Sequence, residues 1–179
     1  MTLFEIIKSL ESNEEIHLGR IILLLNEFSE KGKGEIEGLT KLAKLDFLLR
    51  YPVFLERALA VNGKVTKITV KNHERRSVES KMVRFKYGPW DFRYRKFINI
   101  LVGLGLVYIR LEKRSYNLGL THKGIEIAKK ISKDKEFSDL LERAKLIRTN
   151  FNQSGTNLMK FIYKTFPEIG SLQYGDQIS

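Results

Sequence analysis

The stretch from Tyr87 to Ile131 restricts the fold of this chain more than any other part of its 179 residues. A helix with apolar periodicity is expected to begin after Asp91, a favourable N-cap residue, and to end at a pair of glycines. Two alternating strands follow at 106–112 and 116–120, joined by the polar turn Lys113-Arg114-Ser115. A second amphipathic helix comes next. The stretch therefore predicts a helix, a hairpin and another helix in succession.

Earlier segments supply the other helices of a helical core. Apolar residues recur with helical spacing over 17–31, 39–49 and 53–61, and Pro52 separates the last two segments. Together with the helix and hairpin, this order indicates a winged helix-turn-helix. The predicted fold class is therefore mainly α, of the α+β type. A short amphipathic helix at 2–11 is expected to dock onto the domain or onto a partner.

The chain is expected to divide into a folded domain, a helical lobe and a tail. The predicted parts are a winged-helix domain at 1–133 with an insertion at 62–88 before its third core helix, a helical lobe at 134–169 and a flexible tail at 170–179. Within the insertion, residues 64–71 alternate and predict a strand, whereas 81–88 fits either a strand or irregular structure. In the lobe, Ser154 is expected to cap the last helix.

Positive charge is concentrated in one part of the sequence. The formal net charge is +11, and residues 64–114 carry 14 basic and 4 acidic side chains, which is 14 − 4 = +10. Such a concentration is typical of proteins that bind polyanions. Charge alone fits a solvated basic surface equally well, but its coincidence with the winged helix favours nucleic acid.

The residues predicted to contact DNA lie on the outer face of the third core helix and on the hairpin. On a helical wheel, Arg95, Lys96 and Asn99 lie on the face of that helix away from its apolar stripe or beside it. The tip of the hairpin offers Lys113 and Arg114 for contacts with phosphates. Four further cations extend this surface: Lys81, Arg84, Lys86 and Arg110.

Three neighbouring residues are predicted to have structural roles instead. The helical wheel places Arg93 over the apolar stripe, so it is expected to pair with a carboxylate of Asp91, Asp46 or Glu79. Trp90 is expected to pack against the domain rather than to stack on bases. Asp46 and Arg50, four residues apart on a helix, are expected to form a surface pair of little energetic consequence.

The sequence contains little that is typical of an active site. It has no cysteine, and its three histidines (His17, His73 and His122) are not at the spacing of metal ligands, so they are expected to be surface or capping residues. No phosphate-binding loop is present. We therefore expect no enzymatic activity, no metal and no cofactor.

The N-terminus lacks the basic region of a signal peptide and no apolar run is long enough to span a bilayer, so a cytoplasmic location is expected.

Several blocks of the sequence resemble one family. The longest are EGLTKLAKLDFLLRYP (37–52), SVESKMVRFKYGPWDFRY (77–94) and SGTNLMKFIYKTFPE (154–168), accompanied by GLGLV (103–107) and LTHKG (120–124). Together they resemble the middle component of bacterial three-component ABC-ATPase conflict systems (ABC-3C), the group that includes Lamassu-type defence. The resemblance covers roughly residues 17–168.

The resemblance implies a non-enzymatic subunit that acts beside an SMC/Rad50-like ABC ATPase and an effector such as a nuclease. Such a subunit would bridge the ATPase and the effector and would help to sense double-stranded DNA of phages or plasmids. The alternative hypothesis is a stand-alone winged-helix transcription regulator that binds duplex DNA as a homodimer. A third hypothesis, a small nuclease, lacks a cluster of carboxylates on one face.

Overall fold

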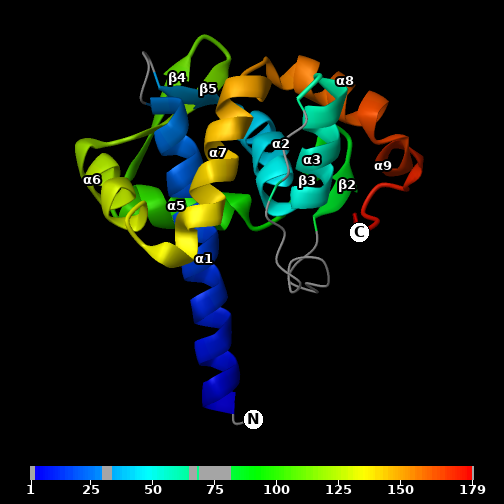
Figure 1. Ribbon diagram of the computed structural model, residues 1–179. Coiled ribbons are helices and arrows are strands. Elements are labelled where there is room, and N and C mark those ends of the chain that lie inside the picture. Colours follow the sequence, from blue (N-terminus) through cyan, green and yellow to red (C-terminus); the bar gives the residue numbers. More distant parts are fainter. Residues whose placement is uncertain (1–2, 30–33, 65–67, 69–81, 179) are drawn as a thin grey trace.

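The computed structural model describes the backbone of residues 3–29, 34–64, 68 and 82–178, with side chains from position 14 onward (Figure 1). The N-terminal half contains α1 (Leu3–Ser29), β1 (Glu35–Glu37), α2 (Gly38–Arg50), α3 (Pro52–Val61), β2 (Val83–Phe85) and β3 (Gly88–Trp90). The remainder contains α5 (Tyr94–Gly103), β4 (Val107–Glu112), β5 (Ser115–Leu120), α6 (His122–Ile131), a 3-10 turn η1 (Lys135–Phe137), α7 (Ser138–Phe151), α8 (Gly155–Thr165) and α9 (Pro167–Ser171).

Within the described residues, the strands form two small antiparallel sheets among the helices. One sheet has the order β1-β5-β4, in which Ile36 of β1 and Ile109 of β4 both lie opposite Leu118 of β5. The other sheet is the pair β2-β3. The chain is thus mainly helical with a small amount of antiparallel sheet, which confirms the α+β class.

Local signals account for the ends of several elements. The Thr121 hydroxyl accepts a hydrogen bond from the Gly124 amide at the start of α6, and the Ser154 hydroxyl caps α8 as predicted. Helix α5 ends at Gly103, and Gly105 has a φ of +70°, a conformation that glycine adopts without strain. At the hairpin tip Lys113 has a φ of 56°.

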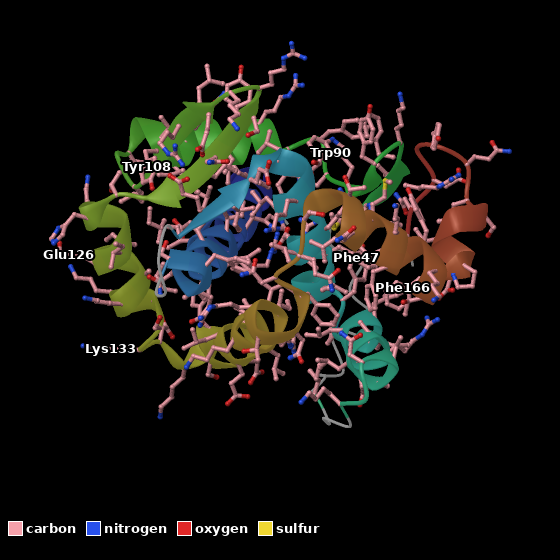
Figure 2. The ribbon with its side chains drawn as sticks, turned by 90° about the horizontal axis from the view of Figure 1, so that it is seen from above. Phe47, Trp90, Tyr108, Glu126, Lys133 and Phe166 are labelled. Atoms are coloured by element: carbon pink, nitrogen blue, oxygen red, sulfur yellow. The ribbon has the colours of Figure 1, made fainter. Side chains whose placement is uncertain are left out.

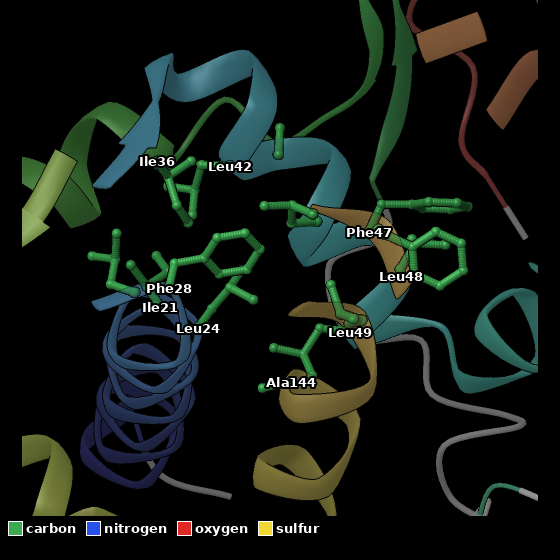
Figure 3. Close-up of a cluster of buried hydrophobic side chains, with 14 of the residues drawn as sticks. Ile21, Leu24, Phe28, Ile36, Leu42, Phe47, Leu48, Leu49 and Ala144 are labelled. Atoms are coloured by element: carbon green, nitrogen blue, oxygen red, sulfur yellow. The ribbon is translucent and has the colours of Figure 1, made fainter. Parts of the chain in front are cut away.

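One hydrophobic core runs through the chain, and α1, α2 and α7 lie at its centre. Figure 3 shows Ile21 and Phe28 of α1 facing Ile36 and Leu42, with Ala144 of α7 below them. Buried residues of α7, α8 and α9 belong to the same cluster as those of α1 and α2. The segment 134–169, predicted as a lobe, therefore packs on the same core as the rest.

The N-terminal region differs from the sequence prediction of two helices. Residues 2–11 and 17–31 were expected to form separate helices, but α1 runs without a break from Leu3 to Ser29. The intervening residues include no proline or glycine, so nothing interrupts the helical hydrogen bonds. In Figure 1 the first turns of α1 extend away from the body of the molecule.

The C-terminal residues also differ from the predicted flexible tail. The backbone amide of Arg84 donates a hydrogen bond to the carbonyl oxygen of Asp176 at 2.8 Å. The backbone amide of Gly175 donates to the carbonyl oxygen of Arg84, also at 2.8 Å. The amide of Ile178 donates to the carbonyl of Met82 at 2.8 Å, and its side chain is buried. The chain end thus pairs with the outer edge of β2. Apart from Lys64 and Ile68, the strand predicted at 64–71 lies outside the described residues.

Candidate functional site

A groove of about 960 Å³ lies beside the β4–β5 hairpin. Its walls come from α5, from the β4–β5 and β2–β3 hairpins and from the N-terminal halves of α2 and α8. The apolar and aromatic lining consists of Leu39, Tyr87, Trp90, Ile98, Ile109, Tyr116, Leu118 and Met159. The charged and amide groups of the lining are Glu37, Lys44, Arg95, Asn99 and Arg114. Cations therefore outnumber acids among the residues that line the groove.

Three residues predicted to contact DNA come together in this groove. Arg95 and Asn99 are exposed and lie one turn apart on α5, and between them Ile98 is buried and holds the helix against the core. Arg114 reaches the same groove from the hairpin tip. The helix and the turn are separated in sequence, and the β4–β5 pairing brings them to one face.

Three other predicted DNA contacts are engaged within the chain. Lys96 forms an ion pair with Glu14 of α1 at 2.6 Å. Arg110 pairs with Glu35 at 2.5 Å, and the hydroxyl of Tyr108 donates to that same carboxylate, whose pKa is lowered chiefly by the hydrogen bond from Arg110. Both ion pairs offset the positive charge that these side chains would offer to a phosphate.

Arg84, the third of them, is held by the C-terminal segment. Its guanidinium donates to the carbonyl oxygen of Leu172 and lies 5.7 Å from the ring of Tyr163 and 4.8 Å from that of Tyr174. The side chain is half-buried, so Arg84 serves the docking of the chain end. Of the remaining predicted cations, Lys86 and Lys113 are exposed outside the groove lining, and Lys81 lies outside the described residues.

The groove contains one cation that the sequence reasoning missed. Lys44 of α2 is only 2% exposed, and its Nζ donates to the carbonyl oxygen of Thr40 at 3.1 Å. No carboxylate within the described part of the chain forms an ion pair with it. Burial lowers the pKa of Lys44 to about 8, because a buried ammonium loses its hydration.

Close packing keeps Lys44 in place. A Cβ atom at Gly88 would lie 3.2 Å from Cε of Lys44, so the lysine stem packs directly against the backbone of β3. Trp90, at the end of the same strand, is half-buried and lies beside α2 (Figure 2). Its ring stacks on that of Phe85 with 5.9 Å between the ring centroids. No sequence pattern marks Lys44, because it lies among apolar residues on a helix that is buried on most sides.

A buried network of charges fixes α5 against α1 and α2. The carboxylate of Asp46 is fully buried and accepts hydrogen bonds from Nε of Arg20 at 2.5 Å and from the hydroxyl of Tyr94 at 2.6 Å. Arg50 lies 3.4 Å from Asp46 and 2.8 Å from Asp91. The predicted surface pair of Asp46 and Arg50 is thus wrong, because tertiary packing buries both side chains.

Arg93 lies at the exposed end of this network. It donates to both carboxylate oxygens of Asp91, at 3.0 and 2.8 Å, so among the predicted partners the structure brings it to Asp91. The side chain of Arg93 is 38% exposed and lies over the ring of Phe97. Burial alone would raise the pKa of Asp91, but hydrogen bonds from Arg93 and the charge and hydrogen bond of Arg50 outweigh it and hold the pKa well below its usual range.

His17 belongs to the same network and not to the surface. Its ring stacks on Phe97, and its Nδ1 lies 3.4 Å from the guanidinium of Arg50. Burial, reinforced by Arg20 and Arg50, lowers the pKa of His17 to about 3. The imidazole is therefore neutral at physiological pH and can accept a hydrogen bond.

Comparisons with known proteins identify no relative of the chain. No family model, no curated protein and no solved structure matches it. Among the described residues, none of the helices combines the length and the apolar character needed to cross a membrane. The same residues contain no group of three or more acidic or histidine side chains positioned to hold a metal ion.

Proposed function

We propose that this chain is a non-enzymatic winged-helix subunit that contacts duplex DNA within an SMC/Rad50-like ABC ATPase complex. In this proposal it bridges the ATPase and an effector nuclease of a defence system of the ABC-3C, Lamassu-type kind. The resemblance of its sequence blocks supports the assignment of these partners. The subunit would recognise invading DNA, and the ATPase and nuclease would carry out the chemistry.

The order of the elements supports the winged helix. The core elements follow the order α1, β1, α2, α5, β4, β5, with the insertion and α3 between α2 and α5. In the three-stranded sheet the first strand pairs with the last, which leaves β4 at the edge. In this arrangement α5 is the recognition helix and the β4–β5 hairpin is the wing.

One observation carries the proposed DNA contact: Arg95 and Asn99 of α5 share a groove with Arg114 of the hairpin tip. Arginine and asparagine side chains can read base edges, and arginine also neutralises phosphates. Lys113, next to Arg114, is exposed and extends this surface. These four residues form the proposed DNA-contact face.

Fluorescence anisotropy of a labelled DNA duplex measures binding and tests whether the DNA-contact face is used. The variant Arg95→Glu/Lys113→Glu/Arg114→Glu should bind the duplex much more weakly, and at low salt the magnitude of the slope of log K against log salt should fall by about 3 if each side chain contacts one phosphate. Lys129→Glu/Lys133→Glu is the control, because both side chains are exposed, Lys129 on α6 and Lys133 just after it. Figure 2 shows Lys133 far from Trp90, which lines the groove. Equal loss in both variants would show that binding is non-specific attraction to a basic protein.

Purification of the tagged chain from its native locus tests the proposed partners. An SMC-like ATPase should co-purify in stoichiometric amount. Recovery of a symmetric homodimer without an ATPase would instead favour the stand-alone regulator.

A further inference from the structure

The interior of the groove carries features that duplex binding does not use. Its lining is mainly apolar, with Trp90 and Met159 among the larger side chains. Tyr116 and Ile109 on the hairpin are 60% and 46% exposed, and their strands present them to this groove. Exposed aromatic and aliphatic groups of this kind are typical of protein-binding surfaces rather than of phosphate-binding ones.

Lys44 adds a recessed positive charge to this apolar surface. It is almost fully buried, whereas Arg95 and Arg114 of the same lining are exposed. Its ammonium has three donors, and the described residues supply one carbonyl acceptor and no carboxylate. A buried cation without a counter-charge is costly, and an anion that reaches it offsets that cost.

The depth of Lys44 indicates what kind of anion fits. The phosphates of duplex DNA lie on the outside of a stiff double helix. In the proposed complex, α5 would enter the major groove of that DNA, which is about 12 Å wide. The phosphates are suited to the exposed Arg95 and Arg114 but not to a recessed ammonium. A single carboxylate on a flexible side chain can enter the groove, while neighbouring apolar side chains of the same peptide cover Trp90 and Met159.

We infer that the groove is a docking site for an acidic peptide segment of a partner protein. One carboxylate of the segment pairs with Lys44, a second meets Arg95 or Arg114, and an apolar side chain rests against Trp90, Tyr116 and Met159. This inference rests on the proposed function, since it names the chemistry by which a partner subunit holds this chain. Because Arg95 and Arg114 also belong to the DNA-contact face, the docked segment would compete with duplex DNA.

Selection from a display library of random peptides of about 12 residues, with the full chain immobilised, tests the inference and does not require the partner itself. The enriched peptides should combine at least two acidic residues with a large apolar residue. Synthetic copies should bind at least tenfold more weakly to Lys44→Met, which retains the packed stem but removes the charge, and to Tyr116→Ala, which alters an exposed side chain. The control Lys129→Glu/Lys133→Glu should bind as the unmodified chain does.

Melting temperatures of the groove variants that are equal to or above that of the unmodified chain would show that they remain folded, and Lys44→Met should be the more stable of the two because it removes a buried charge. An enriched consensus that is neutral or basic would overturn the inference, as would binding that is insensitive to both Lys44→Met and Tyr116→Ala. Failure to enrich any peptide, or binding of single-stranded oligo-dT that requires Lys44, would also overturn it. Co-purification with an ATPase is a separate measurement, so loss of the docking site and loss of the proposed function can be distinguished.

Discussion

Replacement of Asp46 by asparagine should destabilise this protein more than any exposed charge change. The side chain keeps its volume but loses its negative charge. In the native protein the Asp46 carboxylate accepts a hydrogen bond from Arg20 at 2.5 Å and lies 3.4 Å from Nε of Arg50. The side chains of both arginines are less than 10% exposed. Burial by itself raises the pKa of Asp46, yet the charges of the two arginines outweigh it and hold the pKa below the ordinary value.

The size of the expected decrease in the free energy of unfolding depends on what happens to Arg20. Arg50 keeps Asp91 as a partner at 2.8 Å, so Arg20 is the cation left in the core without its carboxylate. Breaking a buried ion pair by removal of one partner costs about 3–5 kcal/mol. For a chain of this length each kcal/mol lowers the melting temperature by about 2–4 °C, so a fall of roughly 6–20 °C is expected.

Urea unfolding, monitored by circular dichroism, measures this decrease in the free energy of unfolding. It should lower the urea concentration at the midpoint without changing the slope of the free energy against urea concentration. Lys96→Met is the matched control, because it removes an exposed pair with Glu14 and should cost about 1 kcal/mol or less. The double variant Arg20→Met/Asp46→Leu should recover part of the loss, since it removes the isolated cation. A loss below about 1 kcal/mol for Asp46→Asn would refute the view that this network is buried and coupled.

Two further predictions concern His17 and the chain end. The unfolded chain binds a proton at His17 near its ordinary pKa of 6.5, whereas the folded chain does so only at about 3, so the free energy of unfolding should decrease by about 1.4 kcal/mol per pH unit as the pH falls below 6.5. His17→Asn should flatten that dependence in urea unfolding between about pH 6.5 and 4.5, and an unchanged slope would assign it to other groups. Ile178→Ala should cost about 2–5 kcal/mol in thermal unfolding, because the side chain is 1% exposed. A frayed terminus would show no change.

Elements set by local chemistry were predicted well. The helix before the hairpin, the paired strands and the cap at Ser154 follow from periodicity, glycines and a hydroxyl side chain within a few residues. The sequence also indicated Arg95, Asn99 and Arg114 as candidates for one face, because helical and hairpin geometry are regular. It did not indicate that Lys96, Arg84 and Arg110 are engaged within the chain, since Glu14, Leu172 and Glu35, which hold them, lie far away in the sequence.

The amino-acid sequence by itself determined the class of the fold, the positions of most helices and strands, and the segment in which positive charge is concentrated. The tertiary structure decided which charges are buried and which remain on the surface. Asp46 meets Arg20 and Tyr94 across 26 and 48 residues, and Arg84 meets Leu172 across 88. Such contacts depend on how distant elements pack, so neither the buried network nor the groove around Lys44 is visible in any local pattern.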